Sequence, residues 1–218
     1  GVPHEFKPRN ETQHVSSMTG FGTHQQPPGS WSDDSSMTFS LVECLIEGYD
    51  RERLKRKYCD WYYWGKWTHD QNLPFDIGRI TFKALSRIKA GISSGETGLT
   101  DEKSNGNGSV MRVLPLAFTL SDKNQKEKIR VIEEVSGITH AHIRSKIACV
   151  MYVEMVEQII KGLEPQDSYN EMVRNIKLYY EGEKSELLHY DRILNCKLLD
   201  LSVDEIRSTG YVVDTIEA

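Results

Sequence analysis

The apolar residues of this chain recur at the spacing of α-helices, and no run shows strand-like alternation followed by a hairpin turn. The longest such pattern covers residues 141–161 and stops at Gly162, a common helix terminator. Similar patterns lie between Trp31 and Gly48 and over residues 51–64, 78–90, 126–135, 169–180 and 184–196, with an apolar segment at 110–120. We therefore expect an all-α fold.

Length and charge narrow the class of protein. The 218 residues suit one compact multi-helix domain. Lys and Arg total 27 against 32 Asp and Glu, a net charge of −5, which argues against a disordered tail and against a nucleic-acid partner. No run is long and apolar enough to span a membrane. The four cysteines lack zinc-site spacing, so we expect buried thiols and a cytoplasmic protein, although four cysteines can still pair. The oligomeric state is left open, with a monomer favoured.

The first 32 residues are polar, are broken by Pro and Gly, and have no usable periodicity. Loops of this length are uncommon in compact domains and are often functional when they are ordered. Ser32, Asp33 and Asp34 stand where this loop enters the first helical run. Adjacent carboxylates and a hydroxyl are hard oxygen ligands for Mg²⁺, Mn²⁺ or Ca²⁺. Plain capping of the helix N-terminus is the alternative interpretation.

Two further polar clusters precede apolar segments. Ser104-Asn105-Gly106-Asn107-Gly108 has the glycine content of a loop whose backbone N–H groups converge on a phosphate, although an ordinary turn explains it as well. His140 and His142 are two residues apart and do not share a helical face. One packed or capping histidine and one exposed histidine is therefore a simpler interpretation than a zinc site.

Together these segments resemble the ADP-ribosylglycohydrolase family. The resemblance rests on the ordered segments GVPHEF, GSWSDDSSM, FDIG, SNGNGSVMR, ITHAH and GYVVDT. It implies an all-α hydrolase that removes ADP-ribose from a modified acceptor with two Mg²⁺ or Mn²⁺ ions, so that an ADP-ribosylated protein or ADP-ribose is the partner. Arginine is the first expectation for the acceptor, and serine or a nucleic-acid base stays open.

The resemblance also implies roles for individual residues. Glu5, Asp33 and Asp34 would be catalytic, and with Ser32 they would hold the metal ions. The residues implied to bind substrate are Ser104, Asn105, Gly106 and Asn107 at the pyrophosphate, His140 near the ribose phosphate, and Tyr211 near the adenine.

Two elements of the family pattern are missing from this sequence. Family members carry a Gly-Asp helix before the VPHEF-like segment and an Asp-x-Asp-Thr motif later, and Val212 stands where the latter would need an Asp before Asp214. We therefore expect residues 1–218 to be one domain that is incomplete at both ends and weakly active alone. A catalytically inactive ADP-ribose-binding protein is the alternative, with a structural role on the same scaffold a remote third.

Overall fold

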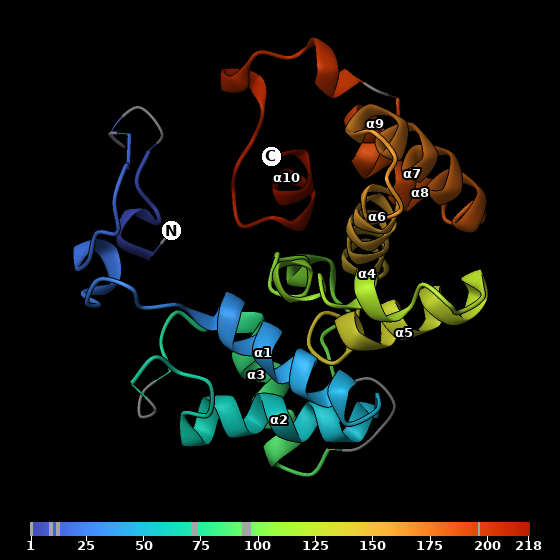
Figure 1. The fold of residues 1–218 in the computed structure, drawn as a ribbon. Coiled ribbons are helices and arrows are strands. Elements are labelled where there is room, and N and C mark those ends of the chain that lie inside the picture. Colours follow the sequence, from blue (N-terminus) through green and yellow to red (C-terminus); the bar gives the residue numbers. More distant parts are fainter. Residues whose placement is uncertain (1, 9–10, 12–13, 71–73, 93–96, 196) are drawn as a thin grey trace.

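The computed structural model describes residues 2–8, 11, 14–70, 74–92, 97–195 and 197–218 (Figure 1). Within these ranges the regular structure is helical, and the only β-type pairings are isolated bridges such as Gly106 with Tyr211. The expected all-α fold is confirmed. None of the described helices is long and apolar enough to cross a bilayer.

Six longer helices hold most of the helical residues that the structure describes. They are α1 (Asp33–Ile46), α2 (Arg51–Trp64), α3 (Arg79–Lys89), α5 (Gln125–Gly137), α6 (Ile143–Ile160) and α7 (Pro165–Tyr179). Short helices are α4 (Leu116–Thr119), α8 (Lys184–Leu187), α9 (Asp191–Leu194) and α10 (Val212–Glu217). The apolar segment at 110–120 forms a 3₁₀ turn, Val110–Arg112, and then α4.

Local signals explain several helix ends. The Asp50 carboxylate accepts a hydrogen bond from the Arg53 N–H and caps the start of α2. Gly65 ends that helix with a φ of 69°, a conformation that glycine adopts without strain. Gly91 and Gly162, expected as helix terminators, follow α3 and α6 with φ values of 73° and 91°.

The helices form two groups around one core. Figure 1 shows α1, α2 and α3 together below and α6 with α5 and α7 beside them. Helix α6 contacts α4, α5, α7 and α10, and the 3₁₀ turn Val110–Arg112 contacts both α1 and α6 and so joins the two groups. Met37, Leu85 and Ile147, one from each of three helices, have no or almost no exposed surface. Burying such side chains stabilises each by about 1.5–3 kcal/mol.

The helical pattern expected over 184–196 is confirmed for residues 184–194, but it is not one regular α-helix. The chain instead forms α8, a 3₁₀ turn over Leu188–Tyr190, and α9. Leu188 is 73% exposed, so the apolar residues of this run do not share one buried face. Tyr190 is fully buried and its hydroxyl donates to the Arg144 carbonyl 2.6 Å away, a contact with α6 that the local pattern does not encode. Cys196, the end of that expected helix, lies outside the described residues.

The described residues among 2–32 form an arm of loops and short 3₁₀ turns beside the start of α1, as Figure 1 shows in blue. Residues 9, 10, 12 and 13 of this N-terminal arm lie outside the described set. Gly22 has a φ of 60°, and a Cβ there would stand 2.1 Å from the Pro3 carbonyl oxygen. Glycine is thus required where the arm folds back on residues 2–4.

Candidate functional site

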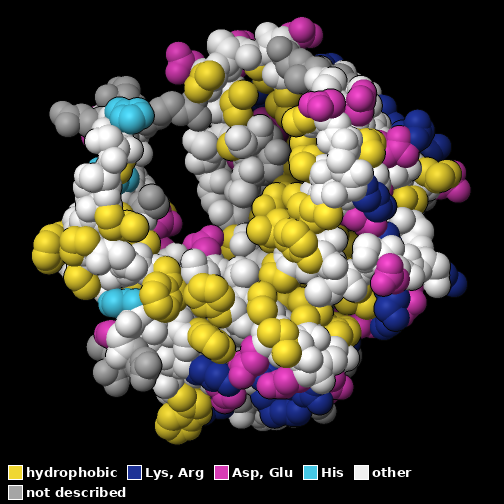
Figure 2. Space-filling view, viewed as in Figure 1, with side chains coloured by type: hydrophobic (Ala, Val, Ile, Leu, Met, Phe, Trp, Pro, Cys, Tyr) yellow, Lys and Arg dark blue, Asp and Glu magenta, His cyan; other side chains and the backbone are white. Residues whose placement is uncertain are grey.

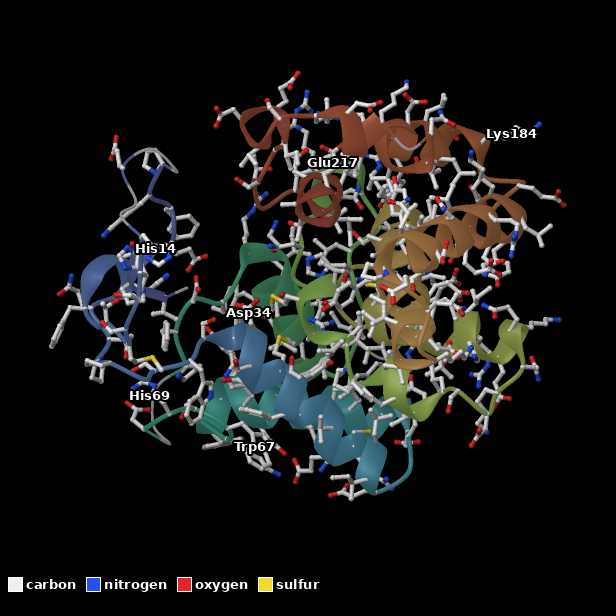
Figure 3. The ribbon with its side chains drawn as sticks, turned by 45° about the horizontal axis from the view of Figure 1, so that its top comes forward. His14, Asp34, Trp67, His69, Lys184 and Glu217 are labelled. Carbon is white, nitrogen blue, oxygen red and sulfur yellow. The ribbon has the colours of Figure 1, made fainter. Side chains whose placement is uncertain are left out.

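Acidic side chains from three separate segments meet at the N-terminus of α1. Glu5 comes from the N-terminal arm, Asp33 and Asp34 from the first turn of α1, and Asp76 from the loop before α3. Figure 3 labels Asp34 between the arm and the helices. Long-range folding has therefore placed four carboxylates in one region, which we call the acidic cluster.

His24 joins the acidic cluster from the arm. Its Nε2 lies 2.7 Å from a Glu5 carboxylate oxygen and 3.5 Å from an Asp76 oxygen. One ligand atom from each of these three side chains lies within 4.8 Å of the other two. That spacing and the predominance of carboxylate oxygens are compatible with a divalent cation.

Two carboxyl groups of the acidic cluster have raised pKa values. Burial, with smaller contributions from the charges of Asp34, Asp76 and Glu5, raises the pKa of Asp33 to about 8 from an ordinary value of 3.8. Burial and a hydrogen bond with Glu5 raise the pKa of Asp76 to about 7. Without a cation, these carboxyls hold protons near neutral pH, mainly because the fold buries them and also because their neighbours are acidic. A bound cation would offset both effects.

Capping of α1 alone does not account for the SDD segment. Ser32 is the N-cap residue but makes no side-chain cap; its hydroxyl donates instead to the Asp34 carboxylate, 2.8 Å away. Asp33 is 6% exposed, whereas a cap gains nothing from burying a carboxyl group. Asp34 remains exposed.

A cavity of about 790 Å³ opens against the acidic cluster. The predicted site residues that line it are Glu5, Asp33, Asp34, Gly106, Asn107 and His140. In Figure 2, the space between the N-terminal arm and the rest of the chain is open, with acidic side chains at its lower edge. This space, here called the first cavity, joins acidic groups to the glycine-rich loop 104–109.

The two ends of that loop face different surroundings. Ser104 and Asn105 are buried beneath it: the Ser104 hydroxyl donates to Asp101, and the Asn105 amide oxygen accepts from Ser145. Neither lines the first cavity. The Asn107 N–H donates to the Gly210 carbonyl at 3.0 Å and is already used within the protein. Of the four predicted loop residues, the cavity is therefore bordered by Gly106 and Asn107.

His140 packs behind the loop and is 2% exposed. Its Nδ1 lies 2.8 Å from the Thr139 hydroxyl. Burial, and next the positive charge of Arg112, lower the pKa of His140 to about 3, so the ring is neutral. A Cβ at Gly108 would stand 2.8 Å from the imidazole Cε1, so the loop needs glycine to lie against this histidine.

Arg112 holds the loop from below and has no exposed surface. Its guanidinium donates to the Gly108 carbonyl and to the Thr139 hydroxyl, each at 2.7 Å, and both acceptors are neutral. The positive charge is therefore buried directly beneath the loop that borders the first cavity.

The remaining predicted residues lie apart from the first cavity. Ser32 borders a second cavity, described below. Tyr211 lines neither; its hydroxyl accepts from the Arg144 guanidinium at 3.1 Å. His142 caps α6 by accepting from the Arg144 N–H.

Four ionisable side chains at the site were not predicted: Lys7, His24, Asp76 and Arg79. Asp76 lies in the FDIG segment, and that motif was the only available sequence signal for it. Its φ is 63°, and the other described non-glycine residues with positive φ (Phe6, Phe21, Gln25 and Trp67) also lie in the arm or in the loop before α3. Such strain persists where surrounding structure holds it, often at functional sites.

Comparisons with known proteins agree with the motif pattern. The family model described as ADP-ribosylglycohydrolase matches residues 1–218. The chain is 29% identical over 225 residues to the ADP-ribosylarginine hydrolase Tri1 of Serratia proteamaculans (strain 568), covering 100% of this chain and 56% of that protein. It is 28% identical, with the same coverage, to the protein of that name in Pseudomonas putida (strain GB-1). The chain spans about half the length of these curated relatives.

Proposed function

The chain belongs to the ADP-ribosylglycohydrolase family, and we propose that its protein hydrolyses the bond joining ADP-ribose to a protein arginine. The observation that carries this proposal is the convergence of Glu5, Asp33, Asp34 and Asp76 on a cavity that the glycine-rich loop also borders. The names of the two bacterial relatives support arginine as the acceptor.

The donor chemistry of the acidic cluster fits Mg²⁺ or Mn²⁺, two ions in the complete site. Glu5, Asp34 and Asp76 offer carboxylate oxygens, and Asp33 is a buried carboxyl that ionises readily only beside positive charge. The Ser32 hydroxyl donates a hydrogen bond to the Asp34 carboxylate and so orients it. When bound, the ions would polarise water and the ribose hydroxyls.

The first cavity has groups suited to the anionic end of the substrate. Lys7 and Arg79 line it together with Gly106, Asn107 and Gly108. Cationic side chains attract the pyrophosphate, and residues without a bulky side chain let it approach the backbone closely. Neutral His140 would donate or accept one hydrogen bond beside the ribose without adding charge.

The hydrolysis then follows from these positions. Water forms a bond to the anomeric carbon as the bond from that carbon to the guanidine nitrogen breaks. Glu5 and Asp34, which reach the cavity with the least burial, take a proton from the water and return one to the leaving nitrogen. The products are ADP-ribose and the restored arginine. Free Cys44, Cys59 and Cys149 fit a reducing compartment such as the cytoplasm, and a monomer stays a prediction.

The test measures release of ADP-ribose from an arginine-modified protein by the full-length protein, with Mg²⁺ or Mn²⁺ and with a chelator. We expect metal-dependent release that Asp34→Asn and Asp76→Asn each reduce by about 100-fold or more. Asp167→Asn, an exposed position on α7, is the matched control and should leave the rate unchanged. Micromolar ADP-ribose binding without release would instead establish the binding-protein alternative.

A further inference from the structure

A second cavity, of about 750 Å³, lies on the arm side of the acidic cluster. The two cavities share only Glu5 and Asp34 among their lining residues. The second one is otherwise bordered by the arm and by the segment that leads into α1, including Trp31 and Ser35. A group bound at Glu5 and Asp34 could therefore extend into both spaces at once.

The charges that border the two cavities differ. Lys7 and Arg79 line the first, beside the glycine-rich loop. The second has no Lys or Arg among its lining residues; its acidic side chains are the shared Glu5 and Asp34, and His4 also lines it. The first cavity therefore suits an anion next to the acidic cluster, whereas the second suits a cation.

An exposed aromatic surface continues from the second cavity. Trp31 stands edge-on to Phe39, with ring centroids 6.0 Å apart, and Phe39 lies 5.8 Å from Trp67. Phe39 and Trp67 are each 40% exposed. His69 lies 6.3 Å from Trp31 on the other side, and Figure 3 shows Trp67 and His69 on the same side of the molecule as Asp34. We call Trp31, Phe39 and Trp67 the aromatic surface.

Hydrogen bonds hold this surface in place. The Trp31 indole N–H donates to the Trp67 carbonyl at 2.8 Å, and the Ser36 hydroxyl donates to the same oxygen at 2.9 Å. The Trp67 indole N–H donates to Glu43 at 3.1 Å, and its backbone has a φ of 66°. An exposed tryptophan fixed at both its backbone and its ring is suited to contacting a partner at low entropic cost.

We propose that the second cavity receives the acceptor arginine and that the aromatic surface docks the polypeptide around it, so that the substrate bridges Glu5 and Asp34 with ADP-ribose on one side and protein on the other. This rests on the proposed function. Carboxylates together with aromatic faces are the groups that recognise a guanidinium, and the absence of Lys and Arg from the lining avoids repulsion.

The first experiment compares two substrates in the full-length protein: free ADP-ribosyl-arginine and a protein carrying the same modification. Phe39→Ser should lower kcat/KM for the modified protein by about tenfold relative to the small substrate. Phe118→Ser is the matched control, because Phe118 is 62% exposed on α4 and lines neither cavity. Equal losses on both substrates with Phe39→Ser would overturn the docking assignment. So would a dimer of the wild-type protein that Phe39→Ser dissociates, since the surface would then bind a second copy.

The second experiment adds a positive charge to the second cavity. Ser35→Lys should weaken binding of ADP-ribosyl-arginine about tenfold while ADP-ribose itself binds as before, because only the former places a cation there. Equal effects on both ligands would overturn the proposal. If the wild-type protein binds but hydrolyses neither substrate, the proposed function fails. Binding affinities then replace kcat/KM: the affinity of Phe39→Ser for the modified protein and that of Ser35→Lys for ADP-ribosyl-arginine, each relative to wild type, still decide the acceptor assignment.

Discussion

Replacing Asp33 by asparagine should stabilise the metal-free protein, although it damages the site. In the folded chain, burial raises the pKa of this carboxyl to about 8, against an ordinary value of 3.8. Between these pH values the folded state binds a proton that the unfolded state lacks, so the free energy of unfolding falls as pH rises from about 4 to 8. Each pKa unit corresponds to about 1.36 kcal/mol, which makes the destabilisation at pH 7 about 4 kcal/mol at most.

Asp33→Asn keeps the shape of the side chain and removes this proton linkage. With a chelator present, we expect the variant to exceed the wild-type unfolding free energy by about 2–4 kcal/mol at pH 7 and by nothing at pH 4. With Mn²⁺ at about 100 times its dissociation constant, the unfolding free energy of the wild type should rise by about 2.7 kcal/mol, and that of the variant by far less. The difference in unfolding free energy between variant and wild type should then become smaller or change sign.

Urea unfolding at pH 4, 5, 6, 7 and 8, with and without metal, measures both effects. Asp167→Asn, which makes the same change at an exposed position, should match the wild type throughout. A variant that is less stable than the wild type in chelator at pH 8, or a difference that does not change with pH, would refute the reasoning. The carboxyl would then be ionised at no cost in the metal-free fold.

Three further outcomes are expected. Metal binding at pH 7 should release about one proton per chain, because Asp33 and Asp76 hold protons there; calorimetry in two buffers of different ionisation enthalpy measures it, and zero release contradicts it. Gly108→Ala should weaken ADP-ribose binding by about tenfold or more because its Cβ would meet the buried histidine behind the loop, while Gly182→Ala, in open space, should not; equal affinities would contradict this. Arg112→Met should lower the free energy of unfolding by about 3 kcal/mol by leaving two buried acceptors unpaired, and a loss under about 1 kcal/mol in urea titration would show that water replaces it.

Helices with local start and stop signals could be predicted from the sequence. The bounds of α2 match the prediction because Asp50 caps its start and Gly65 ends it, and both signals act within a few residues. The helical pattern over 184–196 is confirmed as far as residue 194, but its division into α8, a 3₁₀ turn and α9 could not be predicted, because Tyr190 is buried through a contact with α6, 46 residues earlier. Periodicity reports which residues are apolar but not which distant element will cover them.

The same distinction separates the two halves of the candidate site. Asp33 and Asp34 are adjacent in the sequence, so their proximity needs no knowledge of the fold. The order of the family motifs associates Glu5 with them. Asp76 and His24 enter only through folding: each is one polar residue in a loop, and only the return of the N-terminal arm sets them 3.5 Å apart. The identification of Ser104 and Asn105 as loop residues was likewise local, but their burial beneath the loop depends on Ser145 in α6.

The acidic cluster and Arg112 together suggest why these motifs occur as a set. Asp33 carries a carboxyl that the fold buries at an energetic cost, and Arg112 carries a guanidinium buried among neutral acceptors. Neither group has an opposite charge among its hydrogen-bond partners; Asp33 lines the first cavity, and Arg112 lies beneath the glycine-rich loop that borders it. A ligand that brings cations to Asp33 and phosphates above Arg112 balances both at once. Binding of such a ligand then offsets the cost of burying both groups, which favours the complete ligand over either part alone.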